Sequence, residues 1–158
     1  MKKYVFFVAL ALLIVFTASS MPYEQQTIVP ELRTILEDKP LEEQLSKLEF
    51  TYWGRPISVE ERGYFYFVEF LIRKGTHFIG FGLVSLLFFL FYRKLGWRFP
   101  ALLAIGSTFM IASLDEYRQT LIEGRTGMFG DVVIDTVGAV FFITIIKGFL
   151  TIKKRVSA

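Results

Sequence analysis

The sequence contains no cysteine and a single histidine, and much of the usual catalytic vocabulary is therefore missing. Without cysteine the chain has no disulfide, no thiolate metal site and no cysteine nucleophile. It also contains no His-Glu-x-x-His zinc motif, no phosphate-binding loop and no nucleophile elbow of the serine hydrolases. These absences exclude the common motif-based enzyme classes.

Apolar residues dominate what is present. The 158 residues include 53% hydrophobic residues and 18 phenylalanines, and the mean hydropathy is +0.47. A water-soluble domain of this size could not bury so much apolar surface, so we expect the lipid bilayer as its partner. The isoelectric point near 9.2 reflects basic residues in short clusters beside apolar runs. That pattern indicates membrane topology, and we predict no nucleic-acid partner.

Four apolar stretches are long enough to cross a bilayer. Each is close to the ~20 residues that span a hydrocarbon core of ~30 Å, where only a helix satisfies the backbone. They cover about residues 4–20, 75–92, 99–114 and 132–152. We therefore predict an all-α fold and a single membrane domain over residues 1–158. It is a four-helix transmembrane bundle with a small extracytoplasmic helical segment, about residues 21–74, between the first and second spans.

The distribution of charge orients this bundle. One side of it holds nine basic residues and no acidic one: Lys2, Lys3, Arg93, Lys94, Arg98, Lys147, Lys153, Lys154 and Arg155. Lysine and arginine concentrate in short cytoplasmic loops, which predicts a multi-pass protein of the cell membrane with both termini in the cytoplasm. Alternatively, Lys2-Lys3, the apolar run and Ala18-Ser19-Ser20 form a cleavable signal peptide. Cleavage would leave three spans in the same orientation.

The segment between the first two spans has its own pattern. Leucines and isoleucines recur at helical spacing after Pro30 and again after Pro40, which predicts two short amphipathic helices on the membrane surface or over the bundle. The residues concerned are Leu32, Ile35, Leu36, Leu41, Leu45 and Leu48. Residues 50–53 and 57–59 flank Gly54-Arg55-Pro56, which predicts a small hairpin.

Ionisable residues gather at the outer ends of the last three spans. An unpaired Asp near mid-membrane costs ~2.5–3.5 kcal/mol and less near the interface, so we expect these groups to pair inside the bundle. Beside Glu69, the candidate ligand-binding residues are Arg73, Lys74, His77, Asp115, Glu116, Gln119, Arg125, Asp131 and Asp135. The candidate catalytic residues are His77, Glu116 and Asp131. We assign no metal ion and no cofactor to this set.

Each residue alone also has a structural explanation. His77 could be a hydrogen-bonded packing residue, Arg73 and Lys74 could reach lipid headgroups, and Asp131 could cap a helix. As a group, ionisable residues at membrane depth indicate function. Four glycines in the spans are expected at close helix contacts: Gly80, Gly82, Gly106 and Gly138.

At these residues the sequence resembles the VanZ-like family of small bacterial membrane proteins. The resemblance covers nearly the whole chain and is carried by four ordered motifs. They are Arg73-Lys74-Gly75-x-His77-Phe78, Asp115-Glu116-x-x-Gln119, Gly124-Arg125 and Asp131-x-x-x-Asp135-x-x-Gly138, with Ser19-Ser20-x-Pro22-Tyr23 as a further feature. Many relatives carry Tyr at the position of Phe81 and Asn at that of Asp135. In a shared polar network, hydrogen bonding would differ here.

The resemblance implies a role in the cell envelope. It suggests low-level resistance to teicoplanin, a glycopeptide, through binding of the drug, a lipid-linked cell-wall precursor or a membrane partner. The alternative is a membrane-embedded hydrolase or transferase acting on a lipid-linked substrate, with His77 or Glu116 as acid or base. Arg73, Lys74 and Arg125 would then hold an anionic headgroup. Two further alternatives are a divalent-metal site and purely structural pairing between helices.

Overall fold

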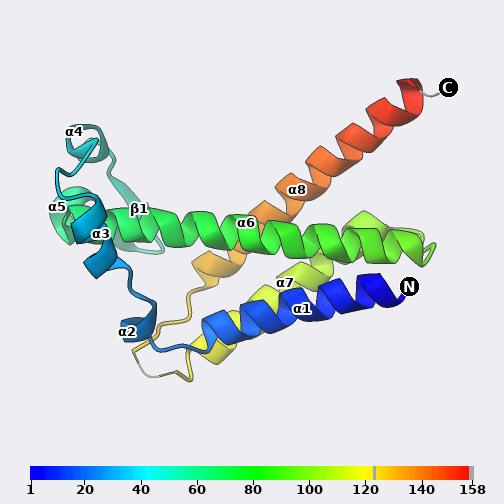
Figure 1. The fold of residues 1–158 in the computed structure, drawn as a ribbon, viewed down its shortest axis with the longest axis horizontal. Helices are drawn as coiled ribbons and strands as arrows, with labels where there is room; N and C mark the ends of the chain where they lie inside the picture. The colour runs from blue at the N-terminus through cyan, green and yellow to red at the C-terminus, as the bar shows by residue number, and fades with distance from the viewer. Residues whose placement is uncertain (123, 157–158) are drawn as a thin grey trace.

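The computed structural model describes residues 1–122 and 124–156 and is mostly helical (Figure 1). All four predicted apolar stretches lie in long helices: α1 (Lys2–Ser19), α6 (Tyr64–Lys94), α7 (Pro100–Gln119) and α8 (Phe129–Val156). Between α1 and α6 lie short elements: α2 (Tyr23–Gln26), α3 (Val29–Ile35), α4 (Glu42–Leu45), β1 (Phe50–Tyr52), β2 (Arg55–Ile57) and α5 (Val59–Arg62).

Three of these helices, α1, α6 and α8, are long and apolar enough to cross a membrane, with mean hydropathies of 1.8, 1.7 and 2.0. The 20-residue helix α7 is not among them. Its last turns carry Asp115, Glu116 and Arg118, which lower its mean hydropathy. The structure therefore fits a membrane protein with three candidate spans in the described chain. A fourth crossing by α7 stays a prediction.

The long helices extend between two different ends of the molecule (Figure 1). The short elements α3 to α5 gather around the start of α6, and α2 lies near the end of α1. Helices α1 and α7 end, and α8 begins, farther along α6 on the same side of the molecule. We call this region, residues 19–74 and 115–135, the polar end. The N-terminus, the α6–α7 turn and the C-terminus lie away from it, and α8 diverges from α6 toward the C-terminus. We call residues 1–3, 93–100 and 147–156 the basic end.

Helix α6 is longer than the predicted span within it. Its 31 residues extend over roughly 46 Å, whereas the hydrocarbon core of a bilayer is ~30 Å thick. The predicted span 75–92 fills the lipid-length part, and residues 64–74 continue the same helix beyond it. Hydropathy predicts only the segment that lipid can surround. The helix continues beyond that segment because its backbone hydrogen bonds do not depend on hydropathy.

Glycine permits the closest contact between α6 and α8. A Cβ on Gly138 would lie 2.2 Å from the backbone oxygen of Phe78, and a Cβ on Gly82 would meet an aromatic ring at 2.5 Å. The packing role is thus confirmed for these two glycines. It is wrong for Gly80 and Gly106, where a Cβ would have no neighbour within 4 Å. Both lie on helix faces that no other helix approaches closely.

The outer segment matches its pattern only in part. Helix α3 contains the predicted Leu32 and Ile35, whereas α4 covers only Glu42–Leu45. Leu41 lies outside α4 because its backbone is left-handed, with φ 61°. Strands β1 and β2 pair antiparallel, with Tyr52 opposite Arg55. The turn consists of Trp53 and Gly54, both with positive φ, the form that favours tight hairpins. It begins one residue before the predicted turn.

Candidate functional site

Helices α6 and α8 face each other through two polar pairs, a lysine–aspartate ion pair and a histidine–aspartate contact. The Lys74 ammonium donates to the Asp131 carboxylate, and His77 Nδ1 lies 3.2 Å from Asp135 Oδ1. Lys74 and His77 are three residues apart on α6, and Asp131 and Asp135 are four apart on α8. The two residues of each helix therefore lie on one face of it. Asp135 is only 1% exposed. This is the pairing expected from the cost of a lone buried carboxylate.

The hairpin adds a third group to the outer pair. The Tyr52 hydroxyl donates to the same Asp131 oxygen that accepts from Lys74, and the Lys74 ammonium lies 4.7 Å from the centre of the Tyr52 ring. Burial, together with the hydrogen bond to Asp131, raises the pKa of Tyr52, so the phenol stays protonated. Tyr52 was not predicted as a site residue, because it lies in a short strand 79 residues before Asp131 and no sequence pattern relates the two.

Glu69 of α6 forms hydrogen bonds with the outer segment. Its carboxylate accepts hydrogen bonds of 2.9 Å from the Tyr23 hydroxyl and from the backbone N–H of Ile28. The Arg73 guanidinium lies 3.7 Å from the same carboxylate. Glu69 is 3% exposed, and these three contacts satisfy a carboxylate that burial would otherwise destabilise.

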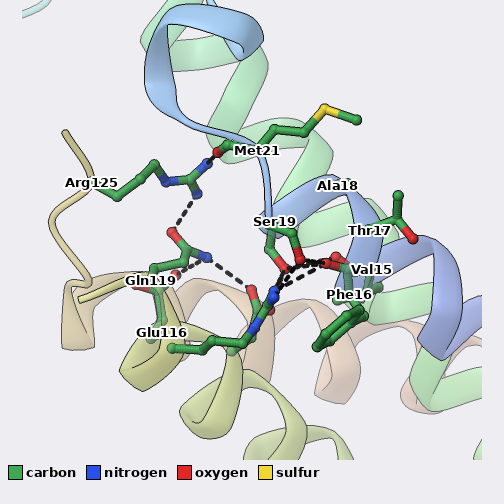
Figure 2. Close-up of polar contacts among 12 residues, drawn as sticks. Val15, Phe16, Thr17, Ala18, Ser19, Met21, Glu116, Gln119 and Arg125 are labelled. Carbon is green, nitrogen blue, oxygen red and sulfur yellow. Dashed lines mark hydrogen bonds and ion pairs between the residues drawn. The ribbon is translucent and has the colours of Figure 1, made fainter. Parts of the chain in front are cut away.

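Asp115 joins the end of α7 to the end of α1. It accepts hydrogen bonds from the Ser19 hydroxyl at 2.5 Å, from Arg118 at 3.1 Å and from Gln119 at 2.8 Å. Figure 2 shows Ser19 at the last turn of α1, within this set of contacts. Arg118 also donates to the backbone oxygen of Phe16. Sequence reasoning did not assign Arg118, although its i, i+3 spacing from Asp115 was the signal that could have found it.

Gln119 and Arg125 extend this network toward the outer segment. Figure 2 shows the Arg125 guanidinium between Gln119 and Met21, and it donates to the Gln119 side chain and to the Met21 backbone oxygen. Burial, with the nearby positive charge of Arg73, lowers the pKa of Arg125. The Glu116 carboxylate accepts hydrogen bonds from the Gln119 side chain at 3.2 Å and from the backbone N–H of Met128 at 2.8 Å.

A cavity of about 180 Å³ lies among these contacts. Six of the nine predicted ligand-binding residues line it: Arg73, Lys74, His77, Gln119, Arg125 and Asp131. The other three, Asp115, Glu116 and Asp135, are buried outside its lining and bond to the residues around it. Four lining residues that sequence reasoning did not place in the site are Tyr23, Tyr52, Arg55 and Arg62.

The cavity is electropositive. Five cationic side chains line it, namely Arg55, Arg62, Arg73, Lys74 and Arg125, against the two carboxylates of Glu69 and Asp131. Both carboxylates already accept hydrogen bonds within the protein. Buried Nη2 of Arg73 has no hydrogen-bond partner among the described residues. Converging guanidinium and ammonium groups favour a small anion.

His77 is the lining residue best suited to proton transfer. Its ring stacks on Phe81 at 6.0 Å, and its Nδ1 faces the buried Asp135 carboxylate. A carboxylate in this position selects the imidazole tautomer and leaves the other ring nitrogen to act on a bound group. Over residues 1–122 and 124–156, no group of three or more His, Asp or Glu side chains is arranged to hold a metal ion.

Comparison with known proteins addresses the family directly. No curated protein and no solved structure matches the chain. A family model described as VanZ/LLP1 matches residues 4–151, which confirms the resemblance drawn from the sequence motifs. From Tyr4 to Thr151 the match includes the four long helices, and it covers every residue that lines the electropositive cavity. Since it covers nearly all of the 158 residues, the chain belongs to the VanZ/LLP1 family.

Proposed function

We propose that the chain is a multi-pass protein of the cell membrane, with four crossing helices and both termini in the cytoplasm. The 20 residues of α7 correspond to roughly 30 Å, the thickness of a hydrocarbon core. The Lys and Arg residues of the basic end support a cytoplasmic position for it. The polar end and its cavity then face the extracytoplasmic side.

We further propose that the cavity binds the anionic headgroup of a lipid-linked envelope molecule, and that this binding contributes to low-level teicoplanin resistance. The observation that carries the proposal is the excess of five cationic side chains over two carboxylates around one small cavity. Burial, and after it the nearby charge of Arg73, lowers the pKa of Arg125, so cations brought together here repel one another. An anion relieves that repulsion.

The size of the cavity favours an indirect effect on the drug. At about 180 Å³ it is smaller than the ~300–1,000 Å³ of pockets that enclose drug-sized ligands. A lipoglycopeptide such as teicoplanin exceeds that size, whereas the headgroup of a lipid-linked precursor can enter in part. Resistance would then follow from retention or altered presentation of the envelope molecule that the drug recognises.

The alternative function is a membrane-embedded hydrolase or transferase with the same headgroup as substrate. The His77–Asp135 pair favours it, because His77 both lines the cavity and faces a buried carboxylate. In this version His77 is the general acid or base, and Arg73, Lys74 and Arg125 hold the anion. Glu116 lies outside the cavity lining, which makes His77 the better candidate.

The test compares resistance with protein level in a deletion strain. The strain is complemented with the wild type, Arg73→Gln, Lys74→Gln or His77→Asn, and with Lys47→Gln as a matched control. Lys47 is an exposed cation that pairs with Glu43 and does not line the cavity. Membrane levels are measured by immunoblot, and susceptibility to teicoplanin is measured beside vancomycin.

We expect resistance to fall in the three cavity variants while membrane levels and the control stay unchanged. Unaltered resistance in all three variants would rule out the headgroup proposal. A fall in membrane level with every change would favour a purely structural role. Conversion of a purified lipid-linked substrate that disappears only in His77→Asn, with headgroup binding retained, would favour the enzyme.

A further inference from the structure

A second, mostly apolar groove adjoins the electropositive cavity. Its volume is about 440 Å³, and it lies between α1 and α6. Apolar and small residues of the two helices line it, among them Ile14, Val15, Ala18, Thr76, Gly80 and Phe81. Arg73, His77 and Arg125 line both the groove and the cavity, so the two spaces meet at the charged residues.

The groove exists because α1 packs loosely. Only 6% of the residues in its apolar window are buried, against 33% in α6 and 39% in α8. Opposite α1, a Cβ on Gly80 would have no neighbour within 4 Å. Ile14 at the rim is 59% exposed, so the groove reaches the outer surface of the helices. In a bilayer that surface faces hydrocarbon chains.

We propose that the occupant of both spaces is a membrane lipid with a phosphate headgroup. Its phosphate lies in the electropositive cavity, and its hydrocarbon chain lies in the α1–α6 groove. This inference rests on the proposed headgroup function and names the class of ligand. The side chains of Arg73, His77 and Arg125 line both spaces, so they lie where the phosphate and the chain would be joined.

Size and charge together select this class over its neighbours. The groove, at about 440 Å³, is close to three times the ~150 Å³ cavity that accommodates a benzene ring. It can therefore take a segment of a hydrocarbon chain. A soluble phosphate ester would leave this apolar space without a ligand. A neutral lipid would leave the excess of the five cations over the two carboxylates of the cavity uncompensated.

The two halves of the proposed site can be changed separately. Gly80→Leu and Ala18→Leu fill the groove from α6 and from α1 without removing any cavity residue. Gly106→Leu is the matched control, because Gly106 also has open space at its Cβ but lies on α7 outside the groove. Arg73→Gln removes one positive charge from the cavity and should weaken its binding of a phosphate. Thermal unfolding in detergent confirms which variants are folded before binding is measured.

Binding is measured on the purified full-length protein by native mass spectrometry. The probes are a phosphatidic acid, a diacylglycerol with the same chains, and glycerol 3-phosphate. We expect the wild type and Gly106→Leu to retain phosphatidic acid and to retain diacylglycerol at least tenfold less. Gly80→Leu and Ala18→Leu should lose phosphatidic acid at least tenfold while binding glycerol 3-phosphate as the wild type does. Arg73→Gln should weaken binding of both phosphates.

Other outcomes separate the two proposals. Undiminished phosphatidic acid binding in folded Gly80→Leu and Ala18→Leu would overturn the groove inference and leave the headgroup function standing. Equal retention of diacylglycerol and phosphatidic acid would also overturn it, since the phosphate would then contribute nothing. Failure of the wild type to bind either phosphate probe, or unaltered binding of both in Arg73→Gln, would overturn the headgroup function itself.

Discussion

The two ends of the molecule treat charge in opposite ways. At the polar end, basic side chains and carboxylates from different helices contact one another, as in Lys74 with Asp131 and His77 with Asp135. At the basic end, a groove of about 700 Å³ is lined by Arg93, Arg98, Lys147 and Lys154, and no acidic side chain of the described chain lines it.

This difference separates two uses of electrostatics in a membrane protein. A buried charge pair loses its hydration, and its mutual attraction offsets that free-energy cost only where the geometry is good. Such a pair therefore holds particular helices in a particular register. Free cations at the bilayer surface keep their hydration or contact lipid headgroups, and their number sets orientation. The polar end therefore contributes specific contacts between helices, and in the proposed topology the basic end orients them in the bilayer.

The largest expected effect comes from removing a carboxylate at the polar end. Asp115→Ala leaves Arg118, Ser19 and Gln119 without their shared acceptor, and breaking a buried pair costs ~3–5 kcal/mol. The control is Glu43→Ala, which breaks the exposed pair with Lys47 and should cost less than ~0.5 kcal/mol. Unfolding in detergent measures both. Equal losses would remove the contrast between buried and exposed pairs.

A smaller effect is expected at the closest helix contact. Gly138→Ala places a Cβ 2.2 Å from the backbone oxygen of Phe78, and such overpacking costs ~1–3 kcal/mol. Gly148→Ala on the same helix has no neighbour within 4 Å, and alanine favours a helix interior by ~0.5–1 kcal/mol. The two substitutions should therefore shift the midpoint of thermal unfolding in opposite directions. A common direction would contradict the close approach.

Neutralising the basic end should barely change stability. The double substitution of Lys147→Gln and Lys154→Gln removes two exposed cations that line the basic groove, and exposed substitutions usually stay within ~0.5 kcal/mol. The same unfolding measurement applies. A loss as large as that of Asp115→Ala would show that this end also depends on charge pairing for its packing.

Orientation can be tested with almost no perturbation. Because the chain contains no cysteine, one introduced cysteine is a unique label site. Leu121→Cys lies at the polar end and Lys94→Cys at the basic end, and both positions are exposed. A membrane-impermeant maleimide should label the first in intact cells and the second only after lysis. The reverse pattern would exclude cytoplasmic termini.

Part of the site could be predicted because it depends on spacing within one helix. Lys74 with His77 and Asp131 with Asp135 each lie on a single face, and the energetic cost of a lone charge in lipid predicts that the faces meet. Arg55 and Tyr52 could not be placed in this way, since they come from a hairpin whose position depends on packing against α6 and α8. Gly80 is similar. Its role depends on how far α1 stays from α6.

The sequence by itself indicated the lipid environment, the long helices and the unequal distribution of charge between the two ends. It could do so because hydropathy and helical period are properties of local segments. Only the tertiary structure decided that Arg73, His77 and Arg125 border both a charged cavity and an apolar groove. That arrangement depends on the distance between helices far apart in the chain. Such a distance is set by packing, as at Gly138 and Phe78, and no local pattern of residues encodes it.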